Sequence, residues 1–252
     1  NASDDAVTAI LIDWSDTLGA ELYDVLETAG IEELKPDDVI TVAVPELDEP
    51  GEITVWNPEY EDIYNEELLE CLQDGDILVL AGSIPDTMPE SMYMDIMEHL
   101  QNKKLNIVVD ATKDLLMNVL AYHPFLIKPN NHELGEIFHE TITEKDDVVK
   151  YAKKLQEKGA RNVLVSMAGD GAVLVTEDGQ EFRSEAPKGK VVNSVGAGDS
   201  MVAGFVYGYL QNHNYADAFR YGICTGSASA FSEELATKAE VEALIEKNKN
   251  LF

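Results

Sequence analysis

Residues 77–81 read Ile77-Leu78-Val79-Leu80-Ala81, a continuous apolar run followed by the loop Gly82-Ser83-Ile84-Pro85. A strand that is apolar at every position is typical of a sheet covered on both faces. On either side of this run, apolar segments of strand length alternate with segments whose apolar residues recur at helical spacing. This order predicts an α/β fold with a mostly parallel central sheet and helices on both of its faces.

The other predicted strands are short apolar or alternating runs between turn residues: Val7–Ile12, Val39–Val44, Ile53–Trp56, Ile107–Val109, Phe125–Ile127, Val163–Val165, Ala172–Thr176 and Glu181–Ser184. The predicted helices cover residues 16–30, Asn65–Leu72, Glu90–Gln101, Asp114–Ala121, His132–Phe138, Asp146–Lys158, Asp199–Leu210, Ala216–Phe231 and Glu240–Lys247. Glycine-containing turns join the last three strands, which predicts an antiparallel edge to the sheet. We expect residues 1–252 to form a single domain.

The charge of the chain is strongly negative. Its 252 residues include 48 acidic and 18 basic ones, a formal net charge of −30. Such a surface repels nucleic acid and anionic membranes, so neither is an expected partner. No apolar run is long enough to span a bilayer, and the first residues do not resemble a signal peptide, which predicts a cytoplasmic protein. Cys71 and Cys224 lack metal-ligand spacing and are expected to be reduced, structural thiols.

The strongest chemical signal lies at residues 191–200, which read Val191-Val192-Asn193-Ser194-Val195-Gly196-Ala197-Gly198-Asp199-Ser200. Glycines let backbone N–H groups approach an anion, and a predicted helix begins directly after them with its positive dipole end. This pattern predicts an anion hole at Gly196, Ala197 and Gly198 for a transferring phosphoryl group. Asp199 would then accept the proton of an acceptor hydroxyl. The spacing matches neither a P-loop nor a dinucleotide fingerprint.

A second signal follows the strand at residues 125–127, where the chain reads Lys128-Pro129-Asn130-Asn131-His132-Glu133. An amide and a carboxylate three residues apart share one face of a helix and can hold hydrated Mg²⁺ near phosphates. The same spacing is also that of a helix-capping box, and the residues alone leave the two interpretations open.

Residues 193–206 resemble the C-terminal motif of the PfkB, or ribokinase-type, carbohydrate kinases. Residues 130–133 resemble the Asn-x-x-Glu motif of the same family. The resemblance implies a ribokinase-like three-layer sandwich and ATP-dependent phosphoryl transfer to a sugar phosphate, with ATP and Mg²⁺ as cofactors. It implies that Gly196, Ala197 and Gly198 form the anion hole, with Asp199 as the base. It also allows a homodimer.

Further segments extend the resemblance along the chain. The resemblance assigns Lys128 to the ATP phosphates and Asn130 and Glu133 to Mg²⁺ and the nucleotide. It assigns Ser83 and Asn57 to the substrate. The other nucleotide-binding residues that it implies are Ser166, Gly169, Gly171, Ser194, Ile223 and Ser227. The sequences of Val108-Val109-Asp110-Ala111 and of residues 124–134 are most similar to the 1-phosphofructokinase and tagatose-6-phosphate kinase branch.

The family's first strand, its lid strands and its Gly-Gly-Lys-Gly-x-Asn segment have no counterpart in this sequence. We therefore expect a chain that is incomplete at its N-terminus and lacks a lid. Near Asp38–Val42 the branch's Thr-Arg-Ile-Asn is also missing, and with it an arginine that would hold a phosphate. An inactive nucleotide-binding scaffold is accordingly an alternative. A remote one is a haloacid-dehalogenase-like phosphatase with Asp13 as nucleophile, suggested by residues 10–18.

Overall fold

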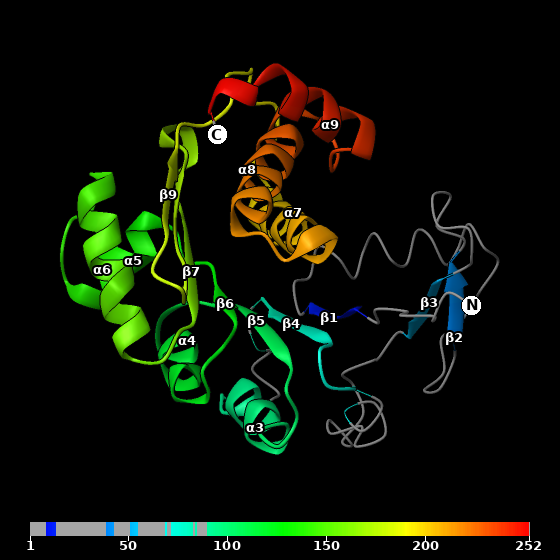
Figure 1. Ribbon diagram of the computed structural model, residues 1–252, viewed down its shortest axis with the longest axis vertical. Coiled ribbons are helices and arrows are strands. Elements are labelled where there is room, and N and C mark those ends of the chain that lie inside the picture. Colours follow the sequence, from blue (N-terminus) through cyan, green and yellow to red (C-terminus); the bar gives the residue numbers. More distant parts are fainter. Residues whose placement is uncertain are drawn as a thin grey trace. The chain divides into compact units, whose positions relative to one another are not determined.

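A computed structural model describes residues 9–13, 39–42, 51–54, 69, 72–82, 84 and 90–251 (Figure 1). The chain divides into two compact units, Asn1–Ile107 and Val108–Phe252. The proposal that residues 1–252 act as a single domain therefore stays a prediction.

The first unit contains a parallel strand pair and a separate hairpin. β1 (Ala9–Asp13) pairs in parallel with β4 (Ile77–Ala81), and β2 (Val39–Val42) pairs antiparallel with β3 (Gly51–Thr54). Four of the five β4 side chains are buried, which confirms the prediction from their apolar run. The helix α3 (Met92–His99) is tied to the end of β4 because the Tyr93 hydroxyl donates to the Ala81 carbonyl at 2.5 Å.

Some predictions for this unit are not tested by the described residues. The expected helix at residues 16–30 and most of the expected helix Asn65–Leu72 lie outside the described residues. The predicted lack of a lid is not tested by the two-stranded sheet and stays a prediction.

The sheet of the second unit is parallel at first and antiparallel at its edge, as predicted. β5 (Asn106–Asp110), β6 (Leu126–Ile127) and β7 (Asn162–Ser166) run parallel to one another. β8 (Ala172–Val175) and β9 (Glu181–Ser184) follow as antiparallel neighbours. Every side chain of β8 and four of the five in β7 are buried, because helices cover both faces of these strands.

The helices of this unit cover the two sheet faces in pairs (Figure 1). The remaining helices, in chain order, are α4 (Lys113–Val119), α5 (Asn131–Phe138), α6 (Lys145–Glu157), α7 (Ala197–Asn212), α8 (Tyr215–Phe231) and α9 (Lys238–Lys247), with short 3-10 turns η1 (Leu120–Tyr122), η2 (Ala168–Asp170) and η3 (Lys249–Leu251). α5 and α6 lie on one face, and α7 and α8 lie on the other. On that second face the rings of Phe125 and Tyr209 are 4.9 Å apart and those of Phe182 and Phe219 are 6.0 Å apart. No helix in the described part of the chain is long and apolar enough to cross a membrane.

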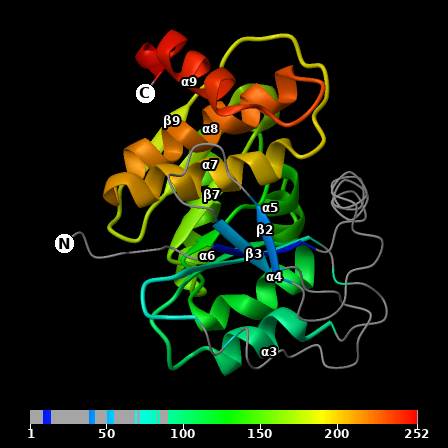
Figure 2. The same ribbon diagram turned by 90° about the vertical axis from the view of Figure 1, so that its right-hand side faces the viewer.

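α7 and α8 run side by side at very short range (Figure 2). A Cβ atom added at Gly204 would lie 2.4 Å from the Thr225 hydroxyl, and one at Gly226 would lie 2.8 Å from the Ala197 carbonyl oxygen. The interpretation of residues 226–231 as a close helix-packing surface is therefore confirmed. Gly226 holds α8 against the first turn of α7.

Cys224 of α8 is fully buried, in a core cluster with Ala228 and Val241. It is a free thiol, and burial raises its pKa to about 12, so it is the inert structural cysteine that the sequence predicted. Cys71 lies outside the described residues.

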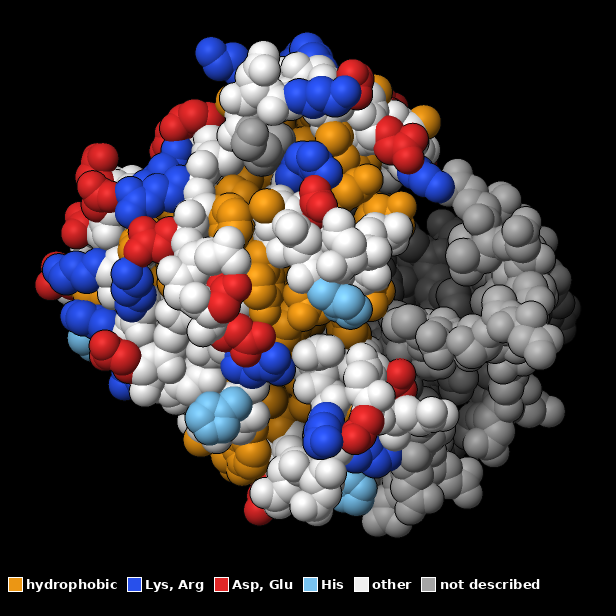
Figure 3. Space-filling model, viewed as in Figure 1, with side chains coloured by type: hydrophobic (Ala, Val, Ile, Leu, Met, Phe, Trp, Pro, Cys, Tyr) orange, Lys and Arg blue, Asp and Glu red, His pale blue; other side chains and the backbone are white. Residues whose placement is uncertain are grey.

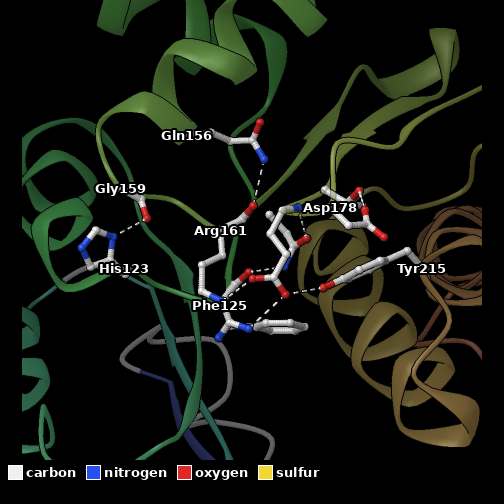
Figure 4. A network of polar contacts seen from close by, with 10 residues as sticks. His123, Phe125, Gln156, Gly159, Arg161, Asp178 and Tyr215 are labelled. Carbon is white, nitrogen blue, oxygen red and sulfur yellow. Dashed lines mark hydrogen bonds and ion pairs between the residues drawn. The ribbon is translucent and has the colours of Figure 1, made fainter.

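A polar network joins β7, β8 and α8 at the amino-terminal end of β7 (Figure 4). The guanidinium of Arg161 binds both carboxylate oxygens of Glu177, at 2.6 and 3.0 Å, and stacks 5.1 Å above the Phe125 ring. The Tyr215 hydroxyl donates to the same carboxylate at 2.8 Å. The hydrogen bond from Arg161 holds the pKa of Glu177 below its usual value. This end of the sheet is therefore held by structural contacts, which leaves the carboxyl ends of the strands for a ligand.

β9 forms the outer edge of the second unit's sheet, and its outward side chains are charged. Glu181 pairs with Lys153 of α6 at 2.6 Å, and Arg183 pairs with both Glu181 and Asp146. Figure 3 shows acidic and basic side chains intermixed over this part of the surface. Exposed pairs of this kind add little stability individually.

Candidate active site

The first turn of α7 is built by the glycine segment. Gly196 precedes the helix with a φ of 72°, the left-handed region that only glycine adopts at low cost. Its carbonyl accepts the Ser200 N–H at 2.8 Å and so begins the helical ladder. The helix therefore begins at Ala197, two residues before the predicted start at Asp199. Asp199 is exposed in the first turn of α7.

The loop that leads into α7 is fixed to the end of α8. The N–H groups of Val192 and Asn193 donate to the Ala230 carbonyl, at 2.8 and 3.3 Å. The Asn193 side chain then accepts the Val195 N–H at 3.0 Å. The Ala197 N–H donates to the Ser194 carbonyl at 3.3 Å, and the Ser194 side chain is exposed. The loop thus has a defined path.

Lys128 reaches this turn from the carboxyl end of β6. Its Nζ lies 3.2 Å from Oδ1 of Asp110, the last residue of β5. A Cβ atom added at Gly198 would lie 3.2 Å from the same Nζ. Lys128 is 8% exposed, so its ammonium is held in the interior between the strand end and the helix start.

Burial raises the pKa of Asp110 from 3.8 to about 6, against the opposing effect of the Lys128 charge. The negative charges of Asp199 and Glu133 raise the pKa of Asp110 further, so both lie close enough to interact with it. Among these charges, the Lys128 ammonium contacts the Asp110 carboxylate where β5 and β6 end.

Asn130 and Glu133 form a capping box at the start of α5. The Asn130 side chain accepts the N–H groups of His132 and Glu133, both at 2.9 Å, and Glu133 Oε2 accepts the Asn130 N–H at 2.8 Å. The capping interpretation of this motif is therefore confirmed. It does not exclude a metal, because Glu133 Oε1 takes no part in the box.

The expected strand and turn beside the nucleotide lie next to this helix. Ser166 ends β7, its N–H donates to the Pro129 carbonyl at 3.2 Å, and it forms a parallel bridge with Asn130. The turn that follows contains Gly169, which has open space around it, and Gly171. Gly171 has a φ of 92°, and a Cβ there would lie 2.0 Å from the Ser184 carbonyl oxygen.

Two of the remaining predicted residues lie on α8 and differ in exposure. Ile223 is 1% exposed and lies in the core, whereas Ser227 is partly exposed on α8. Ser83 and Asn57 lie outside the described residues.

Sequence reasoning assigned no role to Asp110. The sequence did show that one buried strand, β5, ends in Asp110 and that the next strand, β6, is followed by Lys128. The register that brings the two side chains together is visible only in the structure.

Charge is unevenly distributed along the chain. Residues 1–107 contain 27 of the 48 acidic residues but only three of the 18 basic ones. Residues 108–252, which contain the α7 turn and Lys128, are therefore much closer to neutral and repel an anionic ligand less than the total charge suggests.

Comparison with known proteins now places the chain in a family. The model of the pfkB family of carbohydrate kinases matches residues 15–242. A 1-phosphofructokinase from Bacillus subtilis is 46% identical over 89% of this chain and 74% of its own length. A D-tagatose-1-phosphate kinase from Bacillus licheniformis is 34% identical over 67% of the chain and 55% of its own length.

Solved structures agree with the fold. A protein provisionally assigned as a phosphofructokinase from Staphylococcus aureus is 33% identical, with a TM-score of 0.74 over 95% of this chain and 80% of its own. Phosphofructokinase-2 from Escherichia coli has a TM-score of 0.75 over 96% of this chain and 83% of its own, and at 24% identity it supports the ribokinase-like fold alone. By its match over residues 15–242 and its 46% identity to a curated relative, this protein belongs to the pfkB family of carbohydrate kinases and is an ATP-dependent kinase.

Proposed function

We propose that this protein transfers the γ-phosphoryl group of ATP to a hydroxyl of a sugar phosphate, with fructose 1-phosphate as the preferred acceptor. The observation that supports this most strongly is the convergence of Lys128 Nζ and the first turn of α7 at Gly198. An ammonium and a helix N-terminus together provide positive potential for a transferring phosphoryl group. The choice of acceptor follows the similarity to 1-phosphofructokinases.

In the proposed reaction, the acceptor oxygen forms a bond to the γ-phosphorus while the bond from that phosphorus to the bridging oxygen breaks and ADP leaves. Asp199 accepts the proton of the attacking hydroxyl. Its place in the first turn of α7 supports this role, because it lies beside the backbone N–H groups that would stabilise the phosphoryl oxygens. Gly196, Ala197 and Gly198 form the proposed anion hole.

Mg²⁺ would be held beside the phosphates through Asn130 and Glu133. Magnesium commonly uses one or two carboxylates together with water and phosphate oxygens, so the free Oε1 of Glu133 suffices as a donor. When bound, the ion neutralises charge on the phosphates. Among the described residues no group of three or more His, Cys, Asp or Glu side chains could hold a metal.

The remaining roles are also proposals. Ser166, Gly169, Gly171, Ser194 and Ser227 would bind the nucleotide, and Ser83 and Asn57 would bind the acceptor. Ile223 is 1% exposed, so it would act only by packing beneath the nucleotide. Cytoplasmic location and a homodimer stay predictions.

ADP release in the presence of Mg·ATP tests the proposal. Fructose 1-phosphate, fructose 6-phosphate, tagatose 6-phosphate and tagatose 1-phosphate should be compared at equal concentration. We expect the highest kcat/KM with fructose 1-phosphate. If Mg·ATP binds but none of the four acceptors is phosphorylated, the alternative of a nucleotide-binding scaffold replaces the proposal.

The family match argues against the haloacid-dehalogenase alternative. Asp13 ends β1, but residues 15–242 belong to the pfkB model. Release of phosphate from sugar phosphates without ATP would be needed to support Asp13 as a nucleophile.

A further inference from the structure

The residues that end β5 and follow β6 are brought together by strand register. Val108 is paired with Leu126 and Val109 with Ile127, so the next pair in this parallel register is Asp110 and Lys128. Side chains in register on neighbouring strands point to the same face. This explains why Lys128 Nζ and Asp110 Oδ1 lie 3.2 Å apart although 17 residues separate them in the chain.

The position of the Lys128 ammonium is unfavourable without a counter-charge. Only 9% of its side chain and 16% of the Asp110 side chain are exposed, so water contributes little to the solvation of either charge. The ammonium also lies at Gly198, in the first turn of α7, where the helix carries its positive partial charge. Two positive charges at this place repel each other, and Asp110 is the carboxylate in contact with the ammonium.

We propose that Asp110 is a positioning residue that holds the Lys128 ammonium against the first turn of α7, where it binds a phosphate of ATP. This inference rests on the proposed function, because it assumes that the α7 turn receives the nucleotide phosphates. Asp110 itself takes no part in proton transfer in this proposal. It acts on the nucleotide through Lys128.

Whether Asp110→Asn tightens or weakens Mg·ATP binding distinguishes a positioning role from a general electrostatic effect. If Asp110 only adds negative charge near the phosphates, Asp110→Asn removes repulsion and tightens Mg·ATP binding. If Asp110 positions Lys128, the same substitution weakens binding, because the ammonium loses its counter-charge and moves away from the helix end.

A double-mutant cycle on Mg·ATP binding, measured by calorimetry, tests whether Asp110 acts through Lys128. The variants are Asp110→Asn, Lys128→Met and the pair of substitutions together. We expect each single substitution to weaken binding by about tenfold and the double variant to bind no more weakly than Lys128→Met alone. Asp110→Glu should restore part of the affinity. Lys153→Met, which breaks the exposed pair with Glu181, is the control and should bind Mg·ATP like the wild type.

The outcomes are separable. Tighter binding by Asp110→Asn, or losses that multiply in the double variant, would overturn the inference while leaving the proposed kinase function intact. Absence of turnover in a wild type that binds Mg·ATP, with a coupled cycle, would overturn the acceptor assignment and leave the inference standing. Failure of the folded wild type to bind Mg·ATP would overturn the positioning role. Thermal melts of each variant establish that the protein measured is folded. If Asp110→Asn does not fold, the conservative variant Asp110→Glu takes its place in the cycle.

Discussion

The hydroxyl of Ser229 on α8 donates a hydrogen bond at 2.9 Å to the hydroxyl of Ser200 on α7, and both side chains are buried. The same Ser229 oxygen accepts the Ala236 N–H at 3.1 Å, from the segment that leads into α9. One side chain thus joins two helices and a loop directly beside Asp199.

Replacement of Ser229 by Ala should lower the free energy of unfolding by about 1–3 kcal/mol, because the Ser200 hydroxyl and the Ala236 N–H lose a buried partner. Urea unfolding measures the change. Ser232→Ala is the control: its hydroxyl donates to the Ala228 carbonyl at 3.0 Å from a partly exposed site, and its loss should be smaller. Equal losses in the two variants would contradict the special importance of Ser229.

Asp199→Asn should lower kcat by about a hundredfold or more while Mg·ATP affinity stays near that of the wild type, because the substitution keeps the shape and removes the base. Steady-state kinetics and calorimetry give the two quantities. Asp217→Asn is a matched control, since Asp217 occupies the first turn of the neighbouring helix α8 and pairs there with Arg220. If Asp199→Asn keeps most of its turnover, Asp199 is not the base.

Gly196→Ala should cost about 1–2 kcal/mol of stability, the penalty for a side chain in the left-handed region. It should also lower turnover, because alanine avoids the left-handed region and would shift the start of α7; the 2.9 Å contact of the new Cβ with Leu235 Cδ2 is relieved by rotation of that exposed side chain. Gly179→Ala isolates the backbone effect: Gly179 has a φ of 83° in the turn between β8 and β9, with nothing within 4 Å of an added Cβ. We expect a similar stability loss in both variants but a loss of activity only at Gly196. A fully active Gly196→Ala would argue against the anion hole.

The raised pKa of Asp110 predicts a pH dependence of stability. Its pKa is about 6 in the folded protein, above the ordinary 3.8, so the folded state binds this proton more tightly than the unfolded state. As the pH falls from about 7 towards 4, the folded state gains a proton first and stability rises, by at most about 3 kcal/mol. Below that range the carboxylates with lowered pKa values, such as Glu177, protonate and stability falls.

Urea unfolding of the wild type and Asp110→Asn at pH 7.5, 6.5 and 5.5 tests this dependence. Neutralisation of the acidic surface contributes to both proteins, so the decisive quantity is the difference between their slopes. The rise towards pH 5.5 should be smaller in Asp110→Asn. Identical slopes would show that Asp110 does not titrate in this range.

The net charge of −30 predicts that the protein is more stable at moderate than at low ionic strength. Salt screens the mutual repulsion of the acidic residues, most of which lie in residues 1–107. Melting temperatures from low salt to about 0.3 M NaCl, with sucrose at the same osmolality as control, measure the effect. A melting temperature that stays flat or falls over this range would contradict it.

The layers of the fold could be predicted because each depends on local pattern. The apolar run at residues 77–81 predicted a strand buried on both faces, and the glycine turns after Ser166 and Val175 predicted the antiparallel edge. The glycine segment at residues 196–198 likewise predicted a helix start, with an error of two residues because Ala197 already has helical geometry.

The parts of the site that depend on register could not be predicted. Asp110 and Lys128 meet because β5 and β6 pair with Val109 opposite Ile127, which places the next residues of the two strands side by side. Nothing in either strand's own sequence determines that register. For Asn130 and Glu133 the sequence predicted the position of the motif but could not decide between two roles. Its spacing fits both a helix cap and a metal site, and the structure confirms the cap while the metal role stays a prediction.

The charged outer face of β9 has a consequence for how copies of the chain meet at high concentration. An edge strand can pair through its backbone donors and acceptors with a strand of another molecule. Charged side chains that form ion pairs with a neighbouring helix disfavour that pairing. Arg183, fixed between Asp146 and Glu181, and Lys153 beside Glu181 keep full charges along this margin. A second molecule would have to desolvate or break these pairs to continue the sheet. Open-ended polymerisation through β9 is thereby disfavoured.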